Sequence, residues 1–171
     1  MEKEDACEIL SKKLEEMQVS RKLDESAIPT IGQAIQESKI RENYWLSNKE
    51  MPSQSAFVLY HATRNTRMIL EKMHERFIHT AELHENPKVI DDAILVFPEL
   101  QELCSFIDTM QKAEVTDSLL DFVRKRVRSL RNTAQKAQMF PSIDEEMKMV
   151  NKTDLKKELN AIADDFRLNL V

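Results

Sequence analysis

The sequence is poor in glycine, because Gly32 is the only glycine among its 171 residues. An average usage of about 7% would give roughly twelve. Gly-rich phosphate loops, dinucleotide-binding fingerprints and nucleophile elbows all need glycine for tight turns or close backbone approach. Hairpin turns favour Asn-Gly, Asp-Gly and Gly-Gly pairs, and the chain has none of them. The glycine content therefore excludes glycine-loop enzymes and disfavours hairpin-rich β folds.

Cysteines and long apolar runs are also scarce. The two cysteines, Cys7 and Cys104, both fall on apolar stripes. A buried free cysteine behaves as a small hydrophobe, so both are predicted to be core thiols in a reducing compartment. The chain has no N-terminal apolar h-region and no run of about 18 apolar residues. We therefore expect an intracellular protein, in the cytoplasm or nucleus, without a secretory signal and without membrane insertion.

Charge and methionine are abundant. Charged residues make up 32% of the chain and hydrophobic residues 42%, with nine methionines and a net charge of −5. This apolar content is sufficient for a core, so wholesale disorder is not expected. The acidic balance argues against a dedicated nucleic-acid-binding protein, because phosphate binding needs a basic face.

Helical periodicity dominates the rest of the chain. Apolar residues recur at steps of three and four, and no segment alternates as a strand would. Helices are predicted at about 4–22, 30–47, 54–85, 87–114 and 117–139, then in a short segment after Pro141 and a last one from Thr153. Short connections predict that the third, fourth and fifth helices are antiparallel neighbours. The predicted fold is all-α: an antiparallel, coiled-coil-like helical bundle of five to seven helices.

Prolines mark most of the expected breaks: Pro29, Pro52, Pro87 and Pro141. Pro87 suits the first position of its helix, and Thr30 is predicted to cap the second helix. Ser142 and Glu145 have the spacing of a capping box. Pro98 differs, because the apolar register of the fourth segment continues through it. One helix kinked at Pro98 is therefore favoured over two separate helices.

The best linker, Ser47–Ser55, divides the chain into an N-terminal helical arm, residues 1–52, and a helical bundle, residues 53–171. The arm carries a narrow seam that includes Leu10, Leu14 and Met17. A helix of about two heptads is marginal alone. The seam is therefore expected to pack on the bundle or on a partner protein, which makes these three residues candidates for partner binding.

An aromatic cluster surrounds the linker and is the second candidate for partner binding. Trp45 is the only tryptophan, and Tyr44, Phe57 and Tyr60 lie close to it in sequence. Tryptophan and tyrosine are enriched in binding hot spots, which points to Tyr44 and Trp45. The alternative is that these rings fasten the linker to the bundle.

The predicted fifth helix contains a basic block that has no acidic residue between Phe122 and Ile143: Arg124, Lys125, Arg126, Arg128, Arg131 and Lys136. Arg124, Arg128 and Arg131 share one helical face, which could dock an acidic helix or a phosphate backbone. The favoured interpretation is intramolecular, because the preceding helix carries six acidic residues against two lysines. Opposite charges on flanking positions help two helices to pair.

No catalytic or metal-binding arrangement is recognisable. His74 and His79 are five residues apart, whereas a zinc-protease helix places its two histidines four apart. Di-iron bundles need two Glu-x-x-His motifs, and Glu71–His74 is the only one. We therefore expect no catalytic residue, no metal site and no cofactor.

These observations favour a non-enzymatic helical adaptor or scaffold subunit of an intracellular complex. It would bind other protein subunits through apolar helical seams, and flanking charges would select the partner. One alternative is a nucleic-acid-associated helical subunit that uses the basic face of the 117–139 helix. Another is a helical-bundle enzyme or carrier with a site between the fourth and fifth helices.

Overall fold

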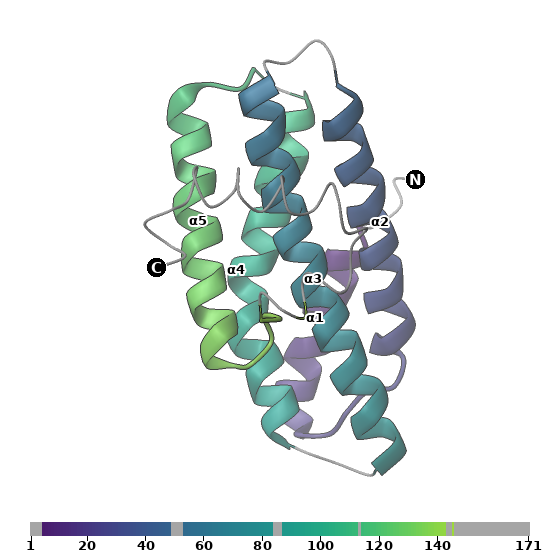
Figure 1. The fold of residues 1–171 in the computed structure, drawn as a ribbon. Helices are drawn as coiled ribbons and strands as arrows, with labels where there is room; N and C mark the ends of the chain where they lie inside the picture. Colours follow the sequence, from purple (N-terminus) through teal and green to yellow (C-terminus); the bar gives the residue numbers. More distant parts are fainter. Residues whose placement is uncertain (1–4, 49–52, 84–86, 113, 143–144, 146–171) are drawn as a thin grey trace.

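The computed structural model describes residues 5–48, 53–83, 87–112, 114–142 and 145, and within these ranges it contains helices and no strand. The five long helices are α1 (Ala6–Ser20), α2 (Ala27–Ser47), α3 (Ser53–Leu83), α4 (Pro87–Lys112) and α5 (Asp117–Lys136). Successive helices run in opposite directions (Figure 1). The prediction of an all-α antiparallel bundle is confirmed. The helix predicted from Thr153 lies outside the described residues.

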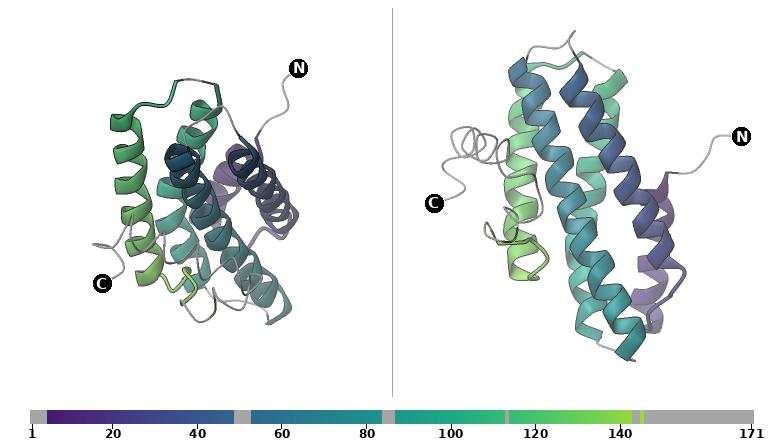
Figure 2. Two further views of the ribbon diagram at one scale, coloured as in Figure 1. Left: turned by 45° about the horizontal axis from the view of Figure 1, so that its top comes forward. Right: turned by 45° about the vertical axis from the view of Figure 1, so that its right-hand side comes forward.

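Helices α1 to α4 form a ring in which α1 and α3 each contact both α2 and α4. Helix α5 packs on α3 and α4, so it lies at one edge of the bundle, with α1 and α2 at the other (Figures 1 and 2). No helix in the described part of the chain is long and apolar enough to cross a membrane.

A single hydrophobic core joins all five helices. Its most deeply buried members include Leu10 of α1, Ile31 of α2, Phe77 of α3, Leu100 of α4 and Leu130 of α5. All five belong to stripes that the helical periodicity predicts. Burying a side chain of this size stabilises the fold by about 1.5–3 kcal/mol. The apolar stripes are thus the main force that assembles the bundle.

The seam of α1 is part of this core. Leu10, Leu14 and Met17 are each at most 3% exposed, and α1 packs against α2 and α4. Of the two expected destinations for the seam, the chain's own bundle is the one observed. These three side chains are not accessible to a partner in this structure.

The start of α2 differs from the prediction by almost one turn. The helix begins at Ala27, and the hydroxyl of Thr30 donates to the carbonyl oxygen of Ser26 at 3.2 Å. Thr30 is therefore inside the helix, and its predicted role as the N-cap is wrong. Pro29 is tolerated in the first turn because the amide it lacks would have no intrahelical partner there. Pro87 begins α4 as predicted.

Helix α4 continues through Pro98 from Pro87 to Lys112. A single helix is therefore confirmed, and a kink at Pro98 stays a prediction.

At the end of α5, the amide of Glu145 donates to Oγ of Ser142 at 3.2 Å. This is the hydrogen bond that the predicted capping box requires of its first residue.

Candidate protein-binding surface

The side of α2 that points away from the bundle is mostly uncharged, and Lys39 at its edge is the exposed charged residue of this helix. Its exposed uncharged residues are Pro29, Gln33, Gln36, Ile40, Asn43, Tyr44 and Ser47, with the exposed residues Lys39 and Leu46 along one edge of them. Steps of three and four place them on one side of the helix, opposite the buried stripe that includes Ile31 and Ser38. We call this surface the outer α2 face. In a chain with 32% charged residues, a helix face of this length with a single charged residue at its edge is unusual.

Two apolar side chains project from the C-terminal half of the outer α2 face. Ile40 is 69% exposed and Tyr44 is 40% exposed. The ring of Tyr44 packs edge-on against that of Trp45, with centroids 4.8 Å apart and an interplanar angle of 76°. Trp45 itself is only 1% exposed. The predicted aromatic pair is therefore divided: Trp45 belongs to the core and supports Tyr44, which is on the surface.

Charged residues beside this face hold α2 in the bundle. On the α3 side, Nε of Arg67 lies 2.6 Å from Oε2 of Glu42, and its Nη1 lies 2.7 Å from Oε1 of Glu71. On the other side, Nη2 of Arg41 lies 3.9 Å from Oδ2 of Asp5 and 3.5 Å from Oδ1 of Asp108. These ion pairs fix the orientation of α2, so the outer α2 face is a preformed surface.

Near Arg41, burial and a hydrogen bond with Asp5 raise the pKa of the Glu37 carboxyl group, while the charge of Arg41 opposes this shift. The raised pKa means that the folded protein binds this proton more tightly than the unfolded chain does. The edge of the outer α2 face next to α1 is therefore sensitive to pH.

The three arginines predicted to share a basic face have different surroundings. Arg128 is exposed, Arg124 is half-buried with Nη1 3.3 Å from Oδ1 of Asp121, and Arg131 is buried. The guanidinium carbon of Arg131 lies 4.4 Å from the ring centroid of Phe140. The three residues therefore do not form one open docking patch.

One member of the basic block joins α5 to α4. Nη2 of Arg126 lies 2.8 Å from Oε1 of Glu102, and the Thr133 hydroxyl donates to Oε1 of Glu99 at 3.2 Å. These contacts agree with the intramolecular interpretation, in which the basic and acidic helices pair with one another.

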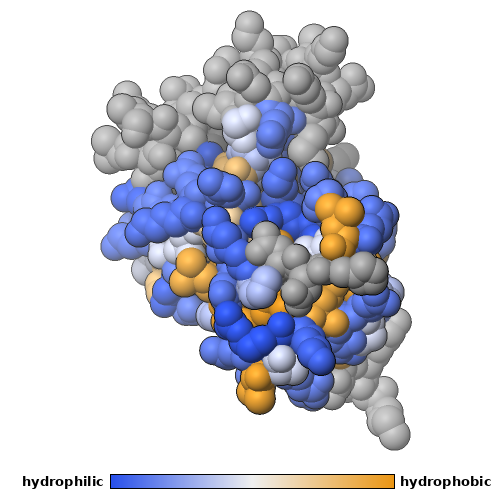
Figure 3. Space-filling model, turned by 90° about the horizontal axis from the view of Figure 1, so that it is seen from below, coloured by the Kyte–Doolittle hydropathy of each residue, from blue (hydrophilic) through white to orange (hydrophobic). Residues whose placement is uncertain are grey.

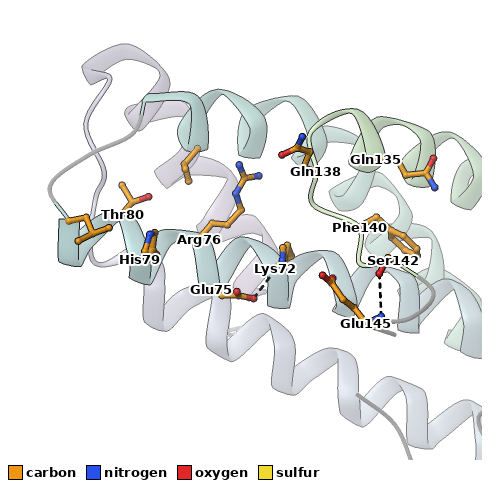
Figure 4. Close-up of a pocket in the computed structure, with 12 residues that line it drawn as sticks. Lys72, Glu75, Arg76, His79, Thr80, Gln135, Gln138, Phe140, Ser142 and Glu145 are labelled. Atoms are coloured by element: carbon orange, nitrogen blue, oxygen red, sulfur yellow. Dashed lines mark hydrogen bonds and ion pairs between the residues drawn. The ribbon is translucent and has the colours of Figure 1, made fainter. Parts of the chain in front are cut away.

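A pocket of about 870 Å³ lies between the second half of α3, the start of α4 and the segment that follows α5 (Figure 4). Arg76 crosses it, with Nη1 donating to the carbonyl oxygen of Ala137 at 2.8 Å and Nη2 donating to Oδ2 of Asp92 at 3.2 Å. Lys72 faces Glu75 at 3.9 Å. These contacts tie Arg76 and Lys72 to neighbouring groups, and no hydrogen bond between the described lining residues couples a hydroxyl nucleophile to a base.

A polar stretch of α3, which includes His61, is buried in the bundle. His61 is fully buried, and the rings of Phe57 and Tyr60 pack edge-on against it at 4.1 and 5.2 Å. Desolvation, aided by the charges of Arg64 and Arg131, lowers the pKa of His61 to about 2. The imidazole is therefore neutral at physiological pH. Within the described ranges, no three His, Cys, Asp or Glu residues are grouped so that they could hold a metal ion.

The end of the bundle where α1, α3 and α5 finish is mainly hydrophilic, with hydrophobic areas scattered among charged ones (Figure 3). Val19 and Leu83, near the ends of α1 and α3, are exposed. Single exposed apolar residues are normal on soluble proteins. This end is therefore a weaker candidate than the outer α2 face.

No known protein family, curated protein or solved structure gives a significant match to this chain.

Proposed function

We propose that this chain is a non-enzymatic helical adaptor or scaffold subunit that binds a protein partner through the outer α2 face. The observation that supports this most directly is the mostly uncharged stripe that carries the exposed side chains of Ile40 and Tyr44. The centre of a protein–protein interface is depleted in charged residues and enriched in aromatic ones. The outer α2 face has this composition.

The mode of binding differs from the one that helical periodicity suggests. The apolar seams are buried within the bundle, so the proposed contact surface does not include them. A partner would instead meet a rigid helix surface on which the Trp45 ring already orients Tyr44. Such pre-organisation reduces the entropy lost on binding. Tyrosine also provides a large contact area at low conformational cost.

The dimensions of the face set the expected strength. An α-helix rises about 1.5 Å per residue, so this 21-residue helix offers a surface roughly 30 Å long. One helix face corresponds to the lower end of specific interface sizes, which bury about 1,200 Å² of accessible surface in total. We therefore expect reversible binding and a strong dependence on the side chains of Ile40 and Tyr44.

Affinity purification with quantitative mass spectrometry tests this proposal. Ile40→Lys should remove the partner that wild type retains, and Tyr44→Ala should weaken its binding by about 30-fold, as hot-spot losses of ≥2 kcal/mol imply. Leu95→Lys is the matched control, because Leu95 is an exposed apolar residue on another helix, α4. An unchanged partner set in Ile40→Lys, or equal loss in both lysine variants, would contradict the proposal.

A nucleic-acid-associated subunit is the second candidate. Lys125, Arg128 and Lys136 are exposed on α5, and together they could contact a phosphate backbone. This candidate predicts binding of DNA or RNA at low salt that weakens steeply as salt increases. The absence of binding at low ionic strength would eliminate it.

A further inference from the structure

The two cysteines of this chain meet in the core, although they lie far apart in sequence. Cys7 is in the first turn of α1 and Cys104 is in α4; they are 2% and 4% exposed. Helices α1 and α4 pack together, and a side-chain hydrogen bond joins the two thiols. No other cysteine occurs in the sequence, so each thiol has only the other as a possible partner for an intramolecular disulfide bond.

The surroundings distinguish the two sulfur atoms. The hydrogen bond with Cys7 lowers the pKa of Cys104, and the positive charge of Arg41 acts in the same direction against the effect of burial. The same hydrogen bond and burial raise the pKa of Cys7. Cys104 therefore has the larger thiolate fraction of the two, and the thiolate is the reactive form. Cys7 is in position to react with it next.

We propose that Cys7 and Cys104 form a reversible disulfide bond, with hydrogen peroxide as the oxidant, that fastens α1 to α4. The Cys104 thiolate attacks one peroxide oxygen, which breaks the O–O bond. Hydroxide leaves, takes up the proton released by Cys104 and becomes water, while Cys104 becomes a sulfenic acid. The sulfur of Cys7 then attacks Sγ of Cys104 and expels hydroxide, which takes the Cys7 proton to form a second water. Two thiols are oxidised by two electrons, and one peroxide is reduced to two waters.

Access to the buried pair follows from its position at the start of α1. Cys7 is the second residue of a 15-residue helix, and its amide donates to Oδ1 of the N-cap residue Asp5 at 3.1 Å. Helix ends open locally at a lower free-energy cost than the core does. Opening of this turn would admit a molecule as small as peroxide.

Mass spectrometry of the full chain treated with hydrogen peroxide tests this proposal. We expect a mass loss of about 2 Da, the loss of both alkylatable thiols, a peptide that links residues 7 and 104, and recovery of the thiols with dithiothreitol. The disulfide closes a loop of roughly 100 residues, so the oxidised protein should melt at least about 5 °C higher than the reduced protein.

Cys7→Ala and Cys104→Ala provide the controls. Each should retain a single cysteine that gains oxygen or forms an intermolecular dimer, without the 2-Da loss. If a variant does not fold, the wild-type experiment still decides the question. The proposal is overturned if the folded wild-type chain keeps both thiols, if each cysteine is oxidised separately, or if the link forms only in denaturant.

Discussion

Replacement of Gly32 by alanine should stabilise this protein. Gly32 lies inside α2, and none of the backbone positions with positive φ is a glycine. The position therefore does not need the conformational freedom that glycine provides. A Cβ atom placed there would lie 3.8 Å from Nε2 of His74, which is an ordinary van der Waals contact. The methyl group fits without displacing its neighbour.

The expected gain comes mainly from the backbone. Glycine in a helix interior is about 0.8–1.0 kcal/mol less favourable than alanine, because it loses more conformational freedom on folding. Contact of the new methyl group with the His74 ring adds a smaller favourable amount. We therefore expect a gain of about 1 kcal/mol in the free energy of unfolding. For a chain of this length that corresponds to a rise of about 2–4 °C in Tm.

Thermal and urea unfolding followed by circular dichroism would measure this gain. The urea midpoint should rise with an unchanged m-value. A matched pair of variants, Gln36→Ala and Gln36→Gly, measures the same backbone difference at an exposed site of α2. A Gly32→Ala protein that is less stable than wild type, while Gln36→Ala is more stable than Gln36→Gly, would refute the reasoning about the contact with His74.

Two further predictions concern the helix end of α5 and the carboxyl group of Glu37. Gln138 follows α5 with φ of 56°, so Gln138→Gly should raise the free energy of unfolding by about 0.5–1 kcal/mol in urea titrations, whereas Gln138→Ala should not. Burial and the hydrogen bond with Asp5 raise the pKa of Glu37. The protonated carboxyl group therefore stabilises the folded protein fully below the ordinary pKa of glutamate, and this stabilisation is lost as pH rises through the folded-state pKa. Glu37→Gln should therefore raise Tm more at pH 7 than at about pH 4; equal shifts at both pH values would contradict this.

The existence and faces of the helices could be predicted from sequence because each helix must bury one stripe. The spacing that places Leu10, Phe77 and Leu130 on apolar stripes is the same spacing that places them in the core. The start of α2 was predicted less accurately. A proline and a threonine near a helix start fit several positions of the first turn, and the capping geometry is decided by the loop that precedes it.

The contacts between helices could not be predicted, because periodicity shows which side of a helix is buried but not which helix covers it. The meeting of Cys7 and Cys104 depends on how α1 docks on α4. The different surroundings of Arg128 and Arg131 likewise depend on how a helix, here α5, docks on its neighbours. Helix α5 packs on both α3 and α4, and Phe140 beyond its end lies against Arg131.

The outer α2 face did have a signature in the sequence. Residues such as Gln33, Gln36 and Ile40 follow one another at helical spacing, and the nearest exposed charge, Lys39, lies at the edge of that side. A search for apolar stripes overlooks it, since most of these residues are polar. A search for missing charge finds it, because the solvent side of a helix in so highly charged a chain should carry lysine and glutamate.

Two residues that are not glycine adopt positive φ at the ends of helices in this glycine-poor chain. Arg21 caps the C-terminal end of α1 with φ of 58°, and Gln138 follows α5 with φ of 56°, in the conformation where helices commonly place glycine. Arg21 gains a partial compensation, because its Nη2 donates to Oδ2 of Asp91 in α4 at 3.0 Å. Both groups are exposed, so this pair contributes little. The chain thus has a glycine where its helix needs none and lacks one at two positions that favour it. The scarcity therefore excludes glycine-dependent loops but is not itself a source of stability.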